Sequence, residues 1–142
     1  MQNLKKLNGG MMTTILDNEF ATLKHYPEKK IVHHVIKKFL FGDNFRNFML
    51  KAADVFVQQK CTKWLSDDRG NSALKPEDLE WAHTNWEPKI FKAGWKFWAI
   101  ILPEKVVGQM NMKKIIERYQ GMGVKVNVFS DPQVAMAWLE KQ

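Results

Sequence analysis

The order in which hydrophobic periodicities follow one another is the strongest constraint on the fold of this chain. Its first part contains three β-prone runs, at residues 13–16, 21–26 and 31–39, separated by connections too short to hold a helix. Three strands joined in this way form an antiparallel meander. The apolar spacing then changes to three and four residues, which is typical of amphipathic helices.

Beyond residue 42, helix-like and strand-like segments alternate. The spacing predicts helices at 43–60, 76–93, 106–120 and from 132 onward, with strands at 63–66, 95–102 and 124–129. Such alternation implies right-handed crossovers onto a largely parallel sheet. We therefore predict a single-domain α/β fold with a mixed sheet: an N-terminal antiparallel β-meander, then βαβ units, with helices on both faces.

The domain boundaries follow from the same pattern. A length of 142 residues suits one domain. Residues 13–142 are predicted to form it, and residues 1–12, which begin basic but lack an apolar run or a cleavage site, are expected to be a flexible N-terminal tail.

Composition limits the partners of the protein. The net charge is +7, but only three of the 22 basic residues are arginine and the lysine pairs are scattered, which argues against a nucleic-acid partner. No run approaches the roughly 20 apolar residues of a membrane span. The lone Cys61 excludes an internal disulfide and indicates a reducing, cytoplasmic location. We expect it to be a small buried hydrophobe.

Four of the six tryptophans lie within residues 81–98. At about 100° per residue, Trp86 falls on the buried face of its helix, whereas Trp81 lies about 140° away beside Asn85. Trp81 could line a pocket or anchor a partner; alternatively, it covers the start of its own helix or a neighbouring loop. Trp95 and Trp98 have odd spacing in the predicted strand, so we expect them to be core residues on opposite faces of the sheet.

Loops that follow parallel strands are the places to look for a site. The loop with Asp67, Asp68 and Arg69 could bind a cation, position a polar ligand or supply an acid and a base. In the structural alternative, an aspartate caps a turn and Arg69 forms an ion pair that holds the loop. Glu104 follows the next strand and joins the candidate binding residues.

The histidines and known motifs indicate no metal and no cofactor. His33 and His34 are adjacent on a strand and therefore face opposite ways. A pair of His25 and His33 across the hairpin is a speculative alternative. The chain contains no P-loop, dinucleotide-binding, nucleophile-elbow or zinc-protease motif, so no catalytic residue is assigned.

Several segments together resemble a group of bacterial SpoIIAA-like proteins, which are grouped with STAS domains and the CRAL-TRIO lipid-binding fold. These segments are residues 63–69 (KWLSDDR), 76–81 (PEDLEW), 85–88 (NWEP), 93–94 (AG), 99–103 (AIILP) and 129–139 (FSDPQVAMAWL). The resemblance spans nearly the whole chain from residue 13 and implies a compact α/β domain of this type. Partner-switching STAS proteins carry an Asp-Ser-x-Gly phosphorylation motif. Residues 72–78 lack it, although Ser72 is a nearby hydroxyl, so no phosphorylation site is assigned.

The sequence supports three hypotheses of function. The first is a non-enzymatic cytoplasmic binding or regulatory module that recognises a protein or a small ligand, and a homodimer is an open alternative for its assembly. The second is a carrier of a small apolar ligand or lipid in the manner of CRAL-TRIO domains, because eight methionines and nine phenylalanines could line an adaptable cavity. The third and weakest is an enzyme that uses Asp67 or Asp68 as a general base.

Overall fold

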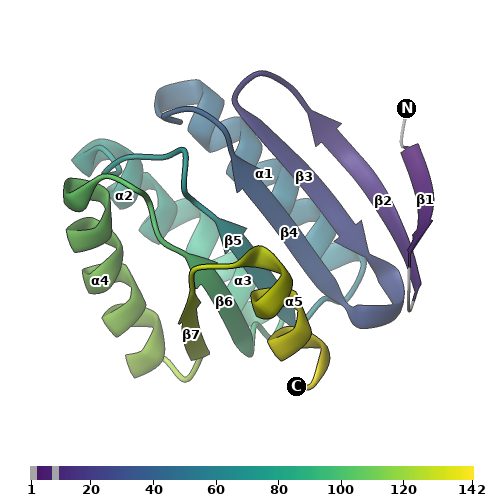
Figure 1. The fold of residues 1–142 in the computed structure, drawn as a ribbon. Coiled ribbons are helices and arrows are strands. Elements are labelled where there is room, and N and C mark those ends of the chain that lie inside the picture. The colour runs from purple at the N-terminus through teal and green to yellow at the C-terminus, as the bar shows by residue number, and fades with distance from the viewer. Residues whose placement is uncertain (1–2, 8–9) are drawn as a thin grey trace.

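A single mixed sheet organises the molecule (Figure 1). The computed structural model describes residues 3–7 and 10–142. The seven strands lie side by side in chain order. They are β1 (Asn3–Leu7), β2 (Gly10–Asp17), β3 (Ala21–Tyr26), β4 (Ile31–Ile36), β5 (Lys63–Asp67), β6 (Phe97–Ile101) and β7 (Lys125–Phe129).

The pairing confirms the predicted mixture of directions. Strands β1 to β4 pair antiparallel, and β4 to β7 pair parallel. Each parallel connection contains helix: α1 (Gly42–Gln58), then α2 (Pro76–Trp81) with α3 (Glu87–Lys92), then α4 (Val106–Gly121). The last helix, α5 (Pro132–Glu140), follows β7. The α/β class and the meander followed by βαβ units are therefore as predicted.

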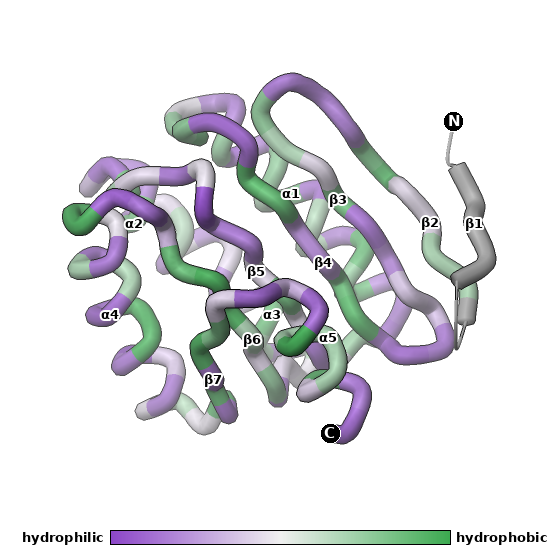
Figure 2. The backbone as a smooth tube through the Cα atoms, viewed as in Figure 1, coloured by the Kyte–Doolittle hydropathy of each residue, from purple (hydrophilic) through white to green (hydrophobic). Residues whose placement is uncertain are grey.

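The helices divide between two hydrophobic cores, one on each face of the sheet. Helices α1 to α4 cover one face around Phe56, Trp64 and Ile90, while α5 alone packs on the other face over Leu65 and Ala99. Figure 2 shows hydrophilic and hydrophobic colours alternating along α4, whereas β6 is more continuously hydrophobic. This difference is expected, because α4 has an exposed side and β6 is covered on both faces.

The N-terminal segment differs from the predicted tail. Residues 3–7 form β1, which pairs with β2, and β2 itself begins at Gly10. This segment joins the edge of the sheet through main-chain hydrogen bonds. Its side-chain pattern did not predict a strand, because such bonds do not depend on side chains. Residues 1–2 and 8–9 of the expected tail lie outside the described residues.

The predicted placement of Trp95 is wrong. Strand β6 begins at Phe97, so Trp95 lies in the short connection before it, and strand alternation does not apply to it. Its ring centroid is 5.4 Å from that of Trp98, and both indoles belong to the same core cluster. The prediction that both are core residues is confirmed, since Trp95 is 6% and Trp98 is 4% exposed.

Candidate functional site

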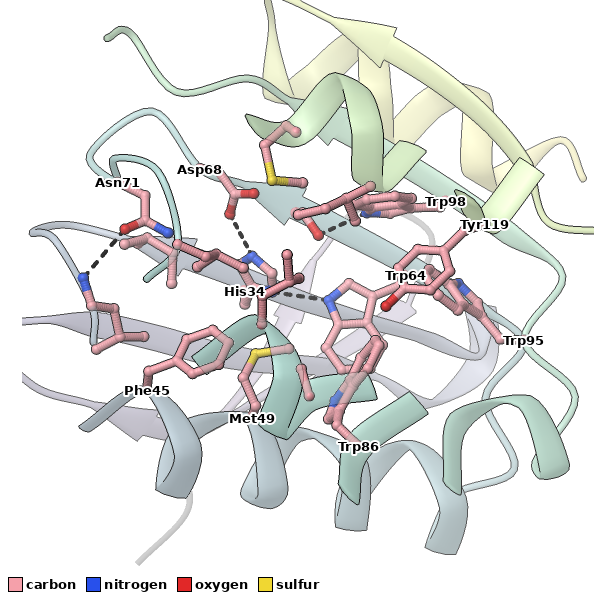
Figure 3. A pocket seen from close by; sticks show the side chains of 18 residues that line it. His34, Phe45, Met49, Trp64, Asp68, Asn71, Trp86, Trp95, Trp98 and Tyr119 are labelled. Atoms are coloured by element: carbon pink, nitrogen blue, oxygen red, sulfur yellow. Dashed lines mark hydrogen bonds and ion pairs between the residues drawn. The ribbon is translucent and has the colours of Figure 1, made fainter. Parts of the chain in front are cut away.

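A cavity of about 80 Å³ lies between the sheet and the helices of its larger core (Figure 3). Its floor comes from β4, β5 and β6, and its walls come from α1, α4 and the helical segment 79–86. The cavity reaches the loop that follows β5, at the carboxyl ends of the parallel strands. This is where ligand sites of such sheets are normally found.

Register brings the polar side chains of the cavity together. His34 on β4 lies beside Ser66 on the parallel strand β5, and neighbours in register point to the same face. Alternation along the chain then places Trp64, Ser66 and Asp68 on that face. All four side chains line the cavity.

His34 is held between two partners. The indole Nε1–H of Trp64 donates to Nδ1 of His34 at 2.9 Å, and Nε2 of His34 lies 2.7 Å from Oδ1 of Asp68. An indole nitrogen can only donate, so Nδ1 must be the unprotonated nitrogen of the ring. His34 is therefore a neutral imidazole whose Nε2–H donates to the Asp68 carboxylate.

Two further hydrogen bonds hold the polar end of the cavity. Nε1 of Trp98 donates to Oγ of Ser66 at 2.8 Å. The backbone N–H of Leu40 donates to Oδ1 of Asn71 at 3.2 Å, which ties the loop after β5 to the chain beyond β4. Close packing supports the same loop, because a Cβ at Gly70 would lie 2.5 Å from the carbonyl oxygens of Ile36 and Lys37.

Aromatic rings form much of the wall. Four contacts, Trp64–Trp86, Trp86–Trp95, Trp95–Trp98 and Trp98–Tyr119, have ring centroids 5.4–5.8 Å apart. Within the described residues, the buried Nε1–H of Trp86 has no hydrogen-bond partner. Burial and the nearby Glu87 carboxylate raise the pKa of the Tyr119 phenol, so this wall residue is neutral.

The outer rim of the cavity is apolar and partly exposed. It consists of Met49 on α1, Leu74 in the loop before α2, and Leu79 on α2. Between α2 and α3 the helix widens into a π-helical turn, η2 (Ala82–Trp86), whose two end residues both line the cavity. Such turns are rare and are often found at functional sites.

The structure separates the residues of the predicted 67–69 site. Asp68 lies in the cavity, but Asp67 points to the opposite face of the sheet, as strand alternation requires. Arg69 donates to both oxygens of Asp67, at 2.9 and 2.7 Å. Burial raises the pKa of Asp67, but the hydrogen bonds from the Arg69 side chain and backbone outweigh it, so the net shift is downward. This bidentate pair corresponds to the structural alternative for Arg69.

The remaining predicted residues lie outside the cavity. Trp81 packs on Phe45 of α1 with ring centroids 6.1 Å apart, and the Arg46 guanidinium lies 5.7 Å from its ring centroid. Asn85 is exposed and donates to the carbonyl of Trp81. Glu104 is exposed beside Arg69, and Ser72 is partly exposed. None of these four residues lines the cavity.

Other predictions for single residues have clear outcomes. Trp86 and Cys61 are buried, as predicted. His33 and His34 face opposite sides of the sheet, and His33 stacks on Tyr26 instead of joining the cavity. His25 pairs with Val32 on the face of the larger core, so the speculative His25–His33 pair is wrong. In the part of the chain that the structure describes, no group of three metal-ligating side chains occurs.

Sequence reasoning missed His34, Ser66, Asn71 and Trp64 as site residues. A usable signal existed for Trp64 and Ser66, because Trp64, Ser66 and Asp68 have a spacing of two and therefore share one face of the strand and its end. His34 gave no such signal, because its role depends on β4 lying beside β5.

The fold and the cavity together define a single-domain α/β protein with an aromatic cavity at the carboxyl ends of its parallel strands. No family model, no curated protein and no solved structure matches this chain. Of the helices in residues 3–7 and 10–142, none is both long enough and apolar enough to cross a bilayer.

Proposed function

We propose that this protein is a non-enzymatic binding module that holds a small ligand in the aromatic cavity. The observation that supports this proposal is that the aromatic cavity adjoins a buried, hydrogen-bonded pair, Asp68 with His34, at the carboxyl ends of the parallel strands. Apolar walls with a few fixed polar groups are the usual construction of ligand sites. A site at this place requires no contribution from Trp81 or Asn85.

The size of the cavity favours a small ligand over a lipid. Ligand pockets for drug-sized molecules measure about 300–1,000 Å³, and a cavity of about 150 Å³ holds one benzene. At about 80 Å³, this cavity fits a molecule of a few heavy atoms. The lipid-carrier alternative would require the Met49, Leu74 and Leu79 rim to move outward.

The geometry gives little support to an enzyme that uses Asp67 as its base and leaves Asp68 as the one proposed base in the cavity. Both oxygens of Asp67 accept hydrogen bonds from Arg69, so this carboxylate is not free to act as a general base. Both ring nitrogens of His34 are engaged as well. The proposed relationship to SpoIIAA-like proteins rests on the sequence segments between residues 63 and 139 and adds no catalytic residue.

Three shape-matched probes test the binding proposal: isopropylamine, 2-propanol and acetone, which share a three-carbon chain with one nitrogen or oxygen atom on the central carbon. We expect at least one to shift the indole N–H signals of Trp64, Trp86 and Trp98 in NMR titrations. Ala82→Leu fills the cavity and should abolish these shifts, whereas Ala137→Leu on the exposed side of α5 should retain them. The proposal fails if no probe shifts these signals, or if Ala82→Leu binds as wild type does.

A second candidate, recognition of a protein, is favoured by one exposed surface. Val106, Val107 and Met110 at the start of α4 are 67%, 58% and 65% exposed. Neighbouring apolar side chains on one helix face are common at protein interfaces. Sedimentation across a range of concentrations tests self-association there: a dimer that Met110→Lys dissociates would support it, and a strict monomer would oppose a homodimer.

A further inference from the structure

We infer that the ligand of the cavity is a small organic cation, an amine whose ammonium group pairs with Asp68. This inference rests on the proposed binding function and assigns its ligand class. The starting point is the charge of the polar end of the cavity. Asp68 is buried, and its carboxylate has a single hydrogen-bond partner within the described residues, Nε2 of His34.

His34 does not neutralise that carboxylate. An imidazolium would need a proton on Nδ1, but Nδ1 accepts the Nε1–H of Trp64 at 2.9 Å. The histidine therefore supplies one hydrogen bond and no positive charge. Trp64 in turn is 1% exposed and packs against Phe56 and Trp86, so it cannot easily turn its N–H elsewhere.

No lysine or arginine among the described residues compensates the charge of Asp68. Lysine and arginine are missing from the described residues that line the cavity. The other buried carboxylates in described ion pairs each have a guanidinium: Asp67 has Arg69, Asp78 has Arg46, and Glu87 has Arg118. A buried charge normally requires a partner of opposite charge. Among these buried carboxylates, Asp68 alone has no guanidinium partner, so it can pair with a cation from outside the protein.

The walls suit a cation that carries alkyl groups. The faces of indole and phenol rings attract positive charge, and rings of this kind form the usual sites for alkylammonium ligands. Trp64, Trp86 and Trp98 line the cavity together with Asp68. A small alkylammonium ion would place N–H groups toward the carboxylate and its carbon atoms against these rings. An organic anion would meet Asp68 with the same charge, and an alcohol would leave that charge uncompensated.

The test compares the affinities of isopropylamine, which is a cation at pH 7, and 2-propanol, measured by tryptophan NMR titration. We expect wild-type protein to bind the amine at least about tenfold more tightly than the alcohol. Asp68→Asn should weaken amine binding about 10- to 100-fold, because the charge is lost while Oδ1 still accepts from His34. Its affinity for 2-propanol should change less than about twofold.

Asp67→Asn is the matched control, because it removes the same charge one residue away on the opposite face of the sheet. It should leave amine affinity within about twofold of wild type. Equal binding of amine and alcohol by wild-type protein would overturn the cation assignment while leaving the binding function intact. Binding of neither would remove the cation assignment, and it would remove the binding function as well if acetone also failed to bind. The ranking of amine over alcohol is measured on wild-type protein, so it tests the cation assignment even if Asp68→Asn does not fold.

Discussion

The indole of Trp64 determines the proton position of His34. Its Nε1–H points at Nδ1 across 2.9 Å, so the only ring proton lies on Nε2, facing Asp68 at 2.7 Å. A buried tryptophan thus sets the charge state of a histidine–carboxylate pair that lies at the polar end of the cavity. The two residues come from adjacent parallel strands, β4 and β5.

This relationship predicts a specific tautomer. In ¹⁵N NMR spectra at pH 7, we expect Nδ1 of His34 to show the shift of an unprotonated nitrogen and Nε2 that of a protonated one. Trp64→Phe removes the donor, so either nitrogen can then carry the single ring proton and the two shifts should approach each other. Equal shifts of the two nitrogens in wild-type protein would contradict the assignment.

The close approach at Gly70 predicts a large effect of a single methyl group. A Cβ there would lie 2.5 Å from the carbonyl oxygens of Ile36 and Lys37, both backbone atoms. We expect Gly70→Ala to lower the free energy of unfolding by about 2–3 kcal/mol, measured by urea denaturation.

Gly121→Ala is the control for this substitution. Gly121 lies at the end of α4, and a Cβ there would have no neighbour within 4 Å. Stability should stay equal or rise by up to about 1 kcal/mol, because alanine favours helix more than glycine does. Equal losses in both variants would show that the contact at Gly70 is not responsible.

Burial predicts that Cys61 is chemically inert. Its side chain is fully buried, and burial raises the pKa of the thiol to about 12, so the reactive thiolate is scarce. At pH 8, a disulfide reagent should label wild-type protein only as fast as the protein unfolds, and urea should accelerate labelling. Cys61→Ala with Ser130→Cys places the thiol on an exposed residue and should react at once. Immediate labelling of wild-type protein would contradict the prediction.

Local periodicity was sufficient to predict most of the fold. The change from period two to period three or four near residue 42 marks the transition from meander to βαβ units, because each element buries one face against its neighbours. Element boundaries were harder. Strand β6 starts two residues later than predicted, which places Trp95 in the connection before the strand. The direction predicted for its side chain from strand alternation was therefore wrong.

The site was predicted only in part, because its residues meet through strand pairing. Asp68 could be proposed from its place after a strand, but treating it together with Asp67 neglected the alternation that separates them. His34 joins the cavity only because β4 lies parallel to β5 in a register that pairs it with Ser66, 32 residues later. No short-range pattern specifies such a register.

The environment of His33 predicts how stability depends on pH. Both ring nitrogens are buried without a hydrogen-bond partner in the described structure, and burial, followed by Lys24 and His34, lowers the pKa of His33 to about 3. Above pH 6.5 the ring is neutral in folded and unfolded chains alike and contributes nothing. Below that pH only the unfolded chain takes up the proton, so stability falls by about 1.4 kcal/mol per pH unit toward pH 3.

Burial also lowers the pKa of His25, which adds a loss of stability of the same sign. Urea denaturation between pH 6 and 5 stays above the ordinary pKa values of aspartate and glutamate and measures this slope. His33→Leu should reduce the loss of unfolding free energy per pH unit by the amount due to one proton. A pH dependence equal to that of wild type would show that His33 is protonated in the folded protein.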